Sequence, residues 1–186
     1  MNYEEDKPIS YCGIFGIYGN TTASVQAYYG LHALQHRGQE ASGIVTRSFN
    51  GDNKAHFNII KGEGLVSEVF ADHNLLTDVL VGNAAIGHNR YSTTGSTKSR
   101  KNIQPFMVNY RMGNLAIGHN GNLTNAKELR EELVNEGAIF QTTSDTEVIL
   151  HLYEEKKEKC LDDLNGQFAF VIWDSVKKEF FAARDR

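Results

Sequence analysis

The stretch Cys12-Gly13-Ile14-Phe15-Gly16-Ile17-Tyr18-Gly19 places a thiol directly before a short apolar run punctuated by glycine. Such a run predicts a buried strand over residues 13–18. Eleven residues precede Cys12, and their removal would give it a free α-amine with a pKa of about 7.7–8.0. Because an adjacent base activates a thiol nucleophile, the stretch predicts a terminal-cysteine nucleophile. The alternative is a buried cysteine that acts as a small hydrophobe.

The composition is that of one globular domain. The chain has 186 residues, of which 40% are hydrophobic and 23% are charged. A net charge of −4 gives no basic surface for nucleic acid, and no apolar run is long enough to span a membrane. Residues 1–11 lack the basic start and apolar stretch of a secretory signal. Two cysteines make no disulfide framework, so we expect a cytoplasmic protein with reduced thiols.

Hydrophobic periodicity and turn residues divide the chain into strands and helices. The strands are predicted at residues 13–18, 42–47, 55–61, 85–89, 116–120, 167–174 and 179–183. The helices are predicted at residues 21–35, 65–71, 124–136 and 144–159, and Cys160 follows the last of them as a structural residue. Blocks of strands with hairpin-like links favour an α+β fold, with antiparallel sheets covered by helices, over a parallel βαβ fold.

The string Ala-Ile-Gly-His-Asn occurs twice, at residues 85–89 and 116–120. Two copies are too few for a repeat architecture. They suggest two strands that deliver polar loops to one edge of a sheet, with His88 and His119 as neighbours in space. The seven histidines lack metal-ligand spacing, so we expect structural hydrogen bonds and no metal.

Two loops each carry an arginine among small polar residues and glycine. They are His36-Arg37-Gly38 and Asn89-Arg90-Tyr91-Ser92-Thr93-Thr94-Gly95. A guanidinium group pairs with a carboxylate through two parallel hydrogen bonds, which makes such a loop a candidate carboxylate clamp. A surface ion pair is the alternative for each.

Asn120-Gly121 and Asp145 are candidate polar groups of the same site. An Asn side chain and the next glycine amide can direct two donors at one oxyanion, whereas the alternative is a tight Asn-Gly hairpin turn. Asp145 lies in the string Ser144-Asp145-Thr146-Glu147, which predicts a capping box at a helix start. Its carboxylate could bind a substrate ammonium or could simply complement the helix dipole.

Taken in order, five strings resemble the glutaminase domain of the N-terminal-nucleophile (class II) glutamine amidotransferases. Within that class, the loop sequences are most similar to those of the glutamine phosphoribosylpyrophosphate (PRPP) amidotransferase family. The strings lie at residues 12–14, 34–43, 88–93, 118–123 and 144–147. The resemblance spans residues 12–186, as a type 2 amidotransferase domain that ends before the phosphoribosyltransferase domain. Residues 1–11 would be a leader removed by self-cleavage.

The resemblance implies a role for each residue of the site. Cys12 would be the nucleophile, with its own amine as the base, and the Asn120 side chain and Gly121 amide would form the oxyanion hole. Tyr91 would couple glutamine binding to a distant synthase site. The residues expected to contact or surround glutamine are Arg37, Gly38, Arg90, Thr93 and Asp145, where Arg90 and Thr93 take the α-carboxylate and Asp145 takes the α-ammonium.

The implied fold is a four-layer αββα sandwich, the fold of N-terminal-nucleophile (Ntn) hydrolases. The implied activity is release of ammonia from glutamine through a cysteinyl thioester, for synthesis of phosphoribosylamine from PRPP in purine biosynthesis. Mg²⁺, and in many relatives with cleaved leaders a 4Fe-4S cluster, would belong to the part beyond residue 186, with no cofactor in this part. The full-length protein would be a homo-oligomer, a dimer or a tetramer. The alternatives are a catalytically silent regulatory module, another class II glutaminase domain, or a terminal-cysteine amidohydrolase acting on other amides.

Overall fold

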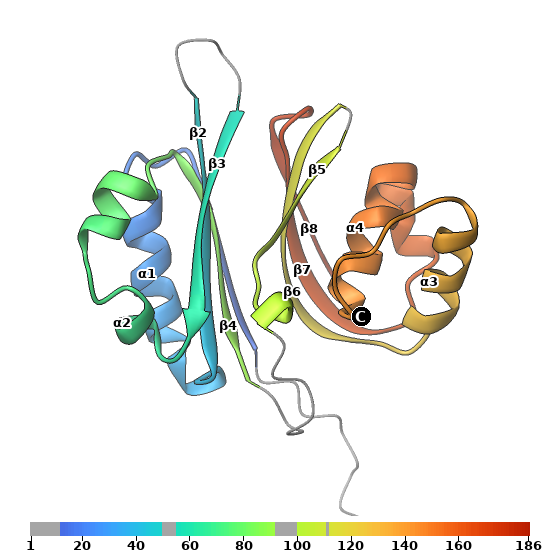
Figure 1. Ribbon diagram of the computed structural model, residues 1–186, viewed down its shortest axis with the longest axis horizontal. Helices are drawn as coiled ribbons and strands as arrows, with labels where there is room; N and C mark the ends of the chain where they lie inside the picture. The colour runs from blue at the N-terminus through green and yellow to red at the C-terminus, as the bar shows by residue number, and fades with distance from the viewer. Residues whose placement is uncertain (1–11, 50–54, 92–99, 111) are drawn as a thin grey trace, which may run out of the picture.

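The computed structural model describes residues 12–49, 55–91, 100–110 and 112–186. It contains two four-stranded antiparallel sheets that pack face to face (Figure 1). The first sheet has the order β1-β4-β2-β3, with bounds Gly13–Tyr18, Ala84–Arg90, Ala41–Phe49 and Ala55–Glu63. The second has the order β5-β6-β7-β8, with bounds Phe106–Tyr110, Gly113–Leu123, Gly166–Asp174 and Glu179–Arg184.

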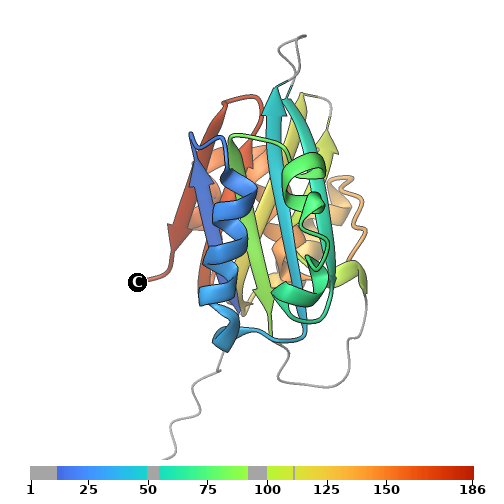
Figure 2. The same cartoon turned by 90° about the vertical axis from the view of Figure 1, so that its left-hand side faces the viewer.

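Helices cover the outer face of each sheet. The first sheet carries α1 (Ala23–Ala33) and α2 (Val66–Val69), as Figure 2 shows, and the second carries α3 (Ala126–Asn135) and α4 (Asp145–Lys156). Four short segments complete the fold: η1 (Gln35–Arg37), the π-helical η2 (Leu75–Val79), η3 (Arg100–Asn102) and η4 (Lys157–Asp162). The predicted α+β class and four-layer sandwich are therefore confirmed. No helix in the described part of the chain is long and apolar enough to cross a membrane.

The alternation of side chains fixes which residues lie between the sheets. A Cβ on Gly118 of β6 would lie 3.0 Å from Ile86 Cγ2 and 3.4 Å from Ile14 Cγ2, so these residues face one another across the two sheets. A Cβ on Gly87 would instead meet Leu31 of α1. Since successive strand residues point to opposite faces, even-numbered residues of β1, β4 and β6 face the space between the sheets.

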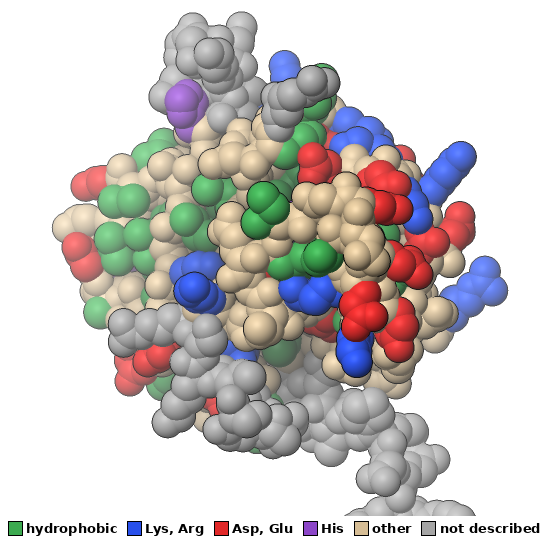
Figure 3. Space-filling view, turned by 45° about the vertical axis from the view of Figure 1, so that its right-hand side comes forward, with side chains coloured by type: hydrophobic (Ala, Val, Ile, Leu, Met, Phe, Trp, Pro, Cys, Tyr) green, Lys and Arg blue, Asp and Glu red, His purple; other side chains and the backbone are tan. Residues whose placement is uncertain are grey.

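Three apolar clusters hold the layers together. One lies between the first sheet and its helices, and a larger one lies between the second sheet and α3 and α4. The cluster between the sheets consists mainly of small or branched residues, with one indole, and contains Val45, Ala84, Ile86, Ala116 and Trp173. Acidic and basic side chains are interspersed over the side formed by α3 and α4 (Figure 3).

The structure corrects several sequence predictions. The two Ala-Ile-Gly-His-Asn strings lie in β4 and β6, which belong to different sheets rather than to one edge of one sheet. Their His and Asn residues lie inside the strands, and Asn120 pairs with Ala169, so the alternative of an Asn-Gly hairpin turn is wrong. Helix α1 ends at Ala33, and the first residues of the loop expected at 36–40 belong to η1. Strand β5 was not predicted.

Only one half of the predicted capping box forms before α4. Ser144 is the N-cap, and its Oγ accepts from the Thr146 N–H at 3.2 Å. The Glu147 carboxylate turns away from Ser144 and accepts from the Gln141 and Thr142 N–H groups, each at 2.7 Å. The leader at residues 1–11, the link at 50–53 and the loop residues 92–99, which include Thr93, lie outside the described residues.

Gly30 of α1 tests the packing of the first sheet against its helix. Helix propensity alone favours alanine over glycine by about 1 kcal/mol. However, a Cβ at Gly30 would lie 2.3–2.6 Å from atoms of the Phe15 ring. We expect Gly30→Ala to lower the free energy of unfolding by about 1–3 kcal/mol, measured by chemical denaturation. The adjacent, exposed Tyr29 is the control: Tyr29→Ala should change it by no more than about 0.5 kcal/mol. A Gly30→Ala protein at least as stable as wild type would contradict this packing.

Candidate active site

The antiparallel pairing of β1 with β4 brings Cys12 to the end of β4. Gly13 pairs with Asn89, so Cys12, which precedes β1, lies beside Arg90 and Tyr91. Cys12 Sγ lies 3.9 Å from the Tyr91 carbonyl oxygen. Continued alternation along β1 and β4 places Cys12 and Arg90 on the faces that look toward the second sheet. Tyr91 is 43% exposed at this end of the sandwich.

The segment η1 supports Cys12 from the other side. Arg37 Nε donates a hydrogen bond to the Cys12 carbonyl oxygen at 3.1 Å. Gly38 packs directly on β4, where a Cβ would lie 2.8 Å from the Asn89 carbonyl carbon and 2.9 Å from that of Arg90. The structure therefore brings Arg37 and Gly38 next to Cys12 and Arg90, and only glycine fits this close approach.

The Cys12 thiol has a raised pKa. Burial is the largest cause, because it disfavours the charged thiolate, and the carboxylate of Asp145 adds to it. The hydrogen bond with the Tyr91 backbone and the positive charges of Arg90 and Arg37 oppose the increase. Charges from β4, η1 and α4 thus act on this one sulfur atom.

The second sheet supplies Asn120 and Gly121 from β6. Asn120 has the same parity as Gly118, so its side chain lies on the face toward the first sheet. Along a strand, successive backbone N–H groups point to opposite edges. On β6, the N–H groups of the odd-numbered residues His119 and Leu123 do not bond to β7: the first donates to Gln104 and the second to Asp145. Regular strand alternation would direct the N–H of Gly121 to that same edge.

Gly121 needs to be glycine. Its φ is +147°, and a Cβ would lie 2.1 Å from the Gln167 carbonyl oxygen and 2.7 Å from the Phe168 Cα on β7. The backbone at this point can therefore approach a neighbouring chain, or a ligand, more closely than any other residue type would allow.

Asp145 occupies the first turn of α4 and lies close to both β6 and Cys12. Its Oδ2 accepts from the Leu123 N–H at 3.0 Å, and its Oδ1 lies 3.7 Å from His119 Nδ1. The side chain is 20% exposed and borders a hollow of about 380 Å³ with Ala126, Lys127, Arg130 and Thr143. Asp145 thus complements the helix dipole and keeps exposed surface for a ligand.

His88 and His119 are neighbours, as expected. His88 Nε2 donates to the His119 carbonyl oxygen at 3.0 Å, and His119 Nδ1 lies 3.1 Å from Thr146 Oγ1. Burial lowers the pKa of His88 to about 3 and also lowers that of His119, so both rings are neutral. In the described ranges, no group of three or more His, Cys, Asp or Glu side chains is arranged to hold a metal ion.

Comparison with known proteins gives the same family at the levels of sequence and structure. The glutamine amidotransferase domain family matches residues 88–186. The amidophosphoribosyltransferase of Lacticaseibacillus casei is 46% identical over 169 residues, which cover 87% of this chain and 84% of that protein. The chain belongs to the amidophosphoribosyltransferase family of glutamine amidotransferases.

Other relatives of this family are longer. Amidophosphoribosyltransferase 2 of Arabidopsis thaliana, a chloroplastic protein, is 51% identical over 97% of this chain, but the match spans only 32% of its own length. The structure of the Bacillus subtilis glutamine PRPP amidotransferase, complexed with ADP and GMP, matches with a TM-score of 0.78 and 41% identity. That match covers 92% of this chain and 37% of the B. subtilis chain.

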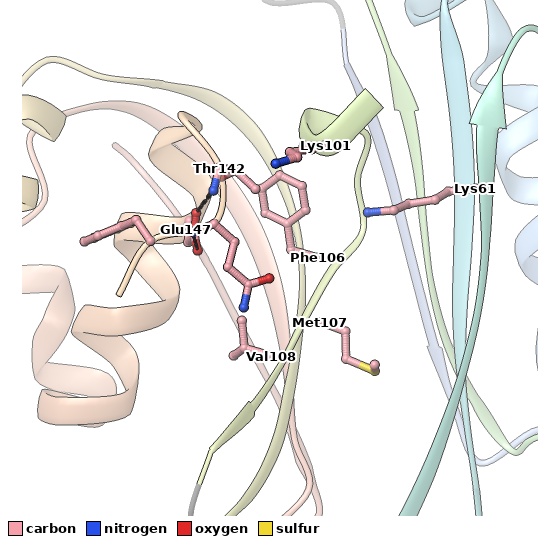
Figure 4. Close-up of a pocket in the computed structure, with 9 residues that line it drawn as sticks. Lys61, Lys101, Phe106, Met107, Val108, Thr142 and Glu147 are labelled. Carbon is pink, nitrogen blue, oxygen red and sulfur yellow. Dashed lines mark hydrogen bonds between the residues drawn. The ribbon is translucent and has the colours of Figure 1, made fainter. Parts of the chain in front are cut away.

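One hollow in this amidotransferase domain lies apart from the candidate site. A cavity of about 500 Å³ lies between the edge strands β3 and β5 and the loop before α4 (Figure 4). None of the predicted site residues lines it. Two of its charged side chains have partners: Lys61 Nζ donates to two backbone carbonyls, and Glu147 accepts from the Gln141 and Thr142 N–H groups (Figure 4).

Sequence reasoning missed Gln104, which is 8% exposed and hydrogen bonded to the main chain of His119. No local pattern marks it, because its partner lies 15 residues further along the chain and on another strand. Cys160 is fully buried, and burial raises the pKa of its thiol to about 12, as expected for a structural cysteine.

The charges around Cys12 predict opposite pH shifts for two variants. Arg90→Gln removes a positive charge that lowers the pKa of the thiol, so alkylation of Cys12 by iodoacetamide should require higher pH than in wild type. Asp145→Asn removes a negative charge that raises it, so the profile should move to lower pH. Mass spectrometry of the alkylated peptide distinguishes Cys12 from Cys160. Shifts in the same direction for both variants would show that these charges do not act on the sulfur.

Proposed function

We propose that this domain hydrolyses the side-chain amide of glutamine to glutamate and ammonia. The observation that supports the proposal is the position of the Cys12 thiol. It lies at the end of the first sheet, on the face toward β6 of the second sheet, where Asn120 and Gly121 can donate hydrogen bonds to an oxyanion. The family to which the chain belongs supports the same reaction.

The proposed reaction has two steps. The Cys12 sulfur attacks the amide carbon of glutamine while its proton passes, directly or through water, to the α-amine of the processed terminus. The Asn120 side chain and the Gly121 N–H stabilise the tetrahedral oxyanion, which in comparable sites is worth roughly 3–4 kcal/mol per donor. The amine then protonates the departing ammonia. Water hydrolyses the remaining glutamyl thioester, which releases glutamate and restores the thiol.

The charged ends of glutamine would be held by residues of β4 and α4 and of the loop after β4. Arg90, with Thr93 beside it, would bind the α-carboxylate, and Asp145 would bind the α-ammonium. Arg37 and Gly38 would line the pocket next to the nucleophile. A plain amide would leave Arg90 and Asp145 without these partners, which disfavours its binding.

The first eleven residues must be removed for this mechanism, because the base is the α-amine of Cys12. We propose that the Cys12 thiol attacks the Tyr11 carbonyl carbon, which transfers the acyl group from nitrogen to sulfur, and that water then cleaves the thioester. Residues 1–11 would leave with a new carboxyl terminus.

The activity of the full-length protein is proposed from its relatives. Ammonia released here would react with PRPP in a phosphoribosyltransferase domain, which would also hold Mg²⁺ and any 4Fe-4S cluster, and Tyr91 would couple the two sites. The B. subtilis relative is described as a PRPP amidotransferase, which supports this assignment. We further propose a cytoplasmic homo-oligomer, although several plant relatives are chloroplastic.

Replacement of the nucleophile tests the proposal. Cys12→Ala should reduce glutamine hydrolysis by at least about 10³-fold, because the covalent step is lost. Cys160→Ala is the matched control, since it removes the other thiol at a buried position away from the site, and it should keep activity. Ammonia release is measured with a coupled assay. Equal activity of Cys12→Ala and wild type would exclude the thioester mechanism, and failure of a glutamine-analogue electrophile to label Cys12 in wild type would favour a silent module.

The mass of the purified protein tests removal of the leader. Active wild-type protein should begin at Cys12, and Cys12→Ala should keep Met1–Tyr11 if the thiol performs the cleavage. Intact mass spectrometry measures both. Full glutaminase activity in wild-type protein that retains residues 1–11 would refute the role of the terminal amine.

A further inference from the structure

At His119, the partner of β6 changes from the main chain of β5 to the side chain of Gln104. Strands β5 and β6 pair from Tyr110 with Gly113 to Phe106 with Ile117, and the same register would place residue 104 opposite His119. The β5 ladder ends at Phe106, before this position. Instead, Gln104 Oε1 accepts from the His119 N–H at 2.7 Å, and Gln104 Nε2 donates to the His119 carbonyl oxygen at 3.0 Å. A side-chain amide thus supplies the two bonds that a paired strand residue would exchange.

Gln104 is itself held by the first sheet. Lys61 Nζ, on β3, donates to the carbonyl oxygens on both sides of Gln104, those of Ile103 at 2.6 Å and Pro105 at 3.2 Å. On β2, a Cβ at Gly43 would lie 2.4 Å from the Gln104 carbonyl oxygen, so the two backbones are in direct contact. The position of the Gln104 amide is therefore set by β2 and β3.

The peptide group that follows His119 is restrained by both sheets. Its carbonyl oxygen accepts from Gln104 Nε2 and also from His88 Nε2 on β4, each at 3.0 Å. This peptide group joins His119 to Asn120, so its orientation sets where the Asn120 side chain begins. One residue further, regular strand alternation would direct the Gly121 N–H to the edge that Gln104 covers.

We propose that Gln104 is a positioning residue of the oxyanion hole. By completing the sheet edge at His119, it fixes the main chain that carries Asn120 and Gly121, so that both donors stay directed at the developing oxyanion. This inference rests on the proposed glutaminase function and adds a residue to it that touches neither glutamine nor Cys12.

The test compares two amide clamps that hold main chain in the same way. Asn125 is the control: its Nδ2 donates to the Asp163 carbonyl oxygen at 2.8 Å and its Oδ1 accepts from the Asn165 N–H at 3.1 Å. Gln104→Met and Asn125→Leu each remove two such bonds with little change of shape. In the full-length protein, Gln104→Met should reduce kcat for glutamine hydrolysis by about 10–100-fold with KM changed by less than about threefold. Asn125→Leu should keep kcat within about twofold of wild type.

A second readout separates positioning from general damage. Alkylation of Cys12 by iodoacetamide forms no oxyanion, so Gln104→Met should react at the wild-type rate while its kcat falls. Gln104→Glu is the second variant: it retains the acceptor for the His119 N–H but sets a carboxylate oxygen against the His119 carbonyl oxygen, so its kcat should fall at least as far as that of Gln104→Met. Wild-type kcat in both Gln104 variants, or an equal loss in Asn125→Leu, would overturn the inference. A wild-type protein unable to hydrolyse glutamine would instead refute the proposed function.

Discussion

The candidate site depends on the close approach of two separate sheets. The proposed nucleophile, Cys12, directly precedes β1 of the first sheet, and the proposed oxyanion donors, Asn120 and Gly121, lie in β6 of the second. Neither sheet can hold both, so their relative position must be fixed to within a fraction of an ångström. Gly118 permits the approach, because a Cβ there would lie 3.0 Å from Ile86 Cγ2. The small size of this residue is a condition for the geometry of the site.

Hydrogen bonds between the two sheets then fix the lateral position of one sheet relative to the other, which apolar packing alone leaves adjustable. Small apolar side chains can slide past one another at little cost, whereas a buried hydrogen bond is lost when its partners move apart. The bond from His88 Nε2 to the His119 carbonyl oxygen crosses directly from one sheet to the other. Because burial keeps His88 neutral, with a pKa of about 3, this bond does not change in the physiological pH range.

Local patterns predicted most elements but not how they pair. Alternating apolar residues and glycine identified seven of the strands. The helix predicted at residues 124–136 matches α3, which ends at Asn135 shortly before Gly137, where φ is +103°. The assignment of the two Ala-Ile-Gly-His-Asn strings to one sheet failed because strand order depends on contacts between distant segments, which no local pattern encodes. Gln104 was missed for the same reason, and β5 was missed because Phe106–Tyr110 is short and only partly buried.

The candidate site residues were predicted from local chemistry and from the family resemblance, but the electrostatic effect that links them emerges only in three dimensions. Arg90 lowers the pKa of the Cys12 thiol and Asp145 raises it. A ligand that neutralised Arg90 alone would make the thiol harder to ionise, and one that neutralised Asp145 alone would make it easier. A zwitterionic amino acid neutralises both, so the two effects oppose each other at the sulfur. A ligand that carries both charges would therefore leave the reactivity of the thiol set mainly by burial, which is the largest influence on its pKa.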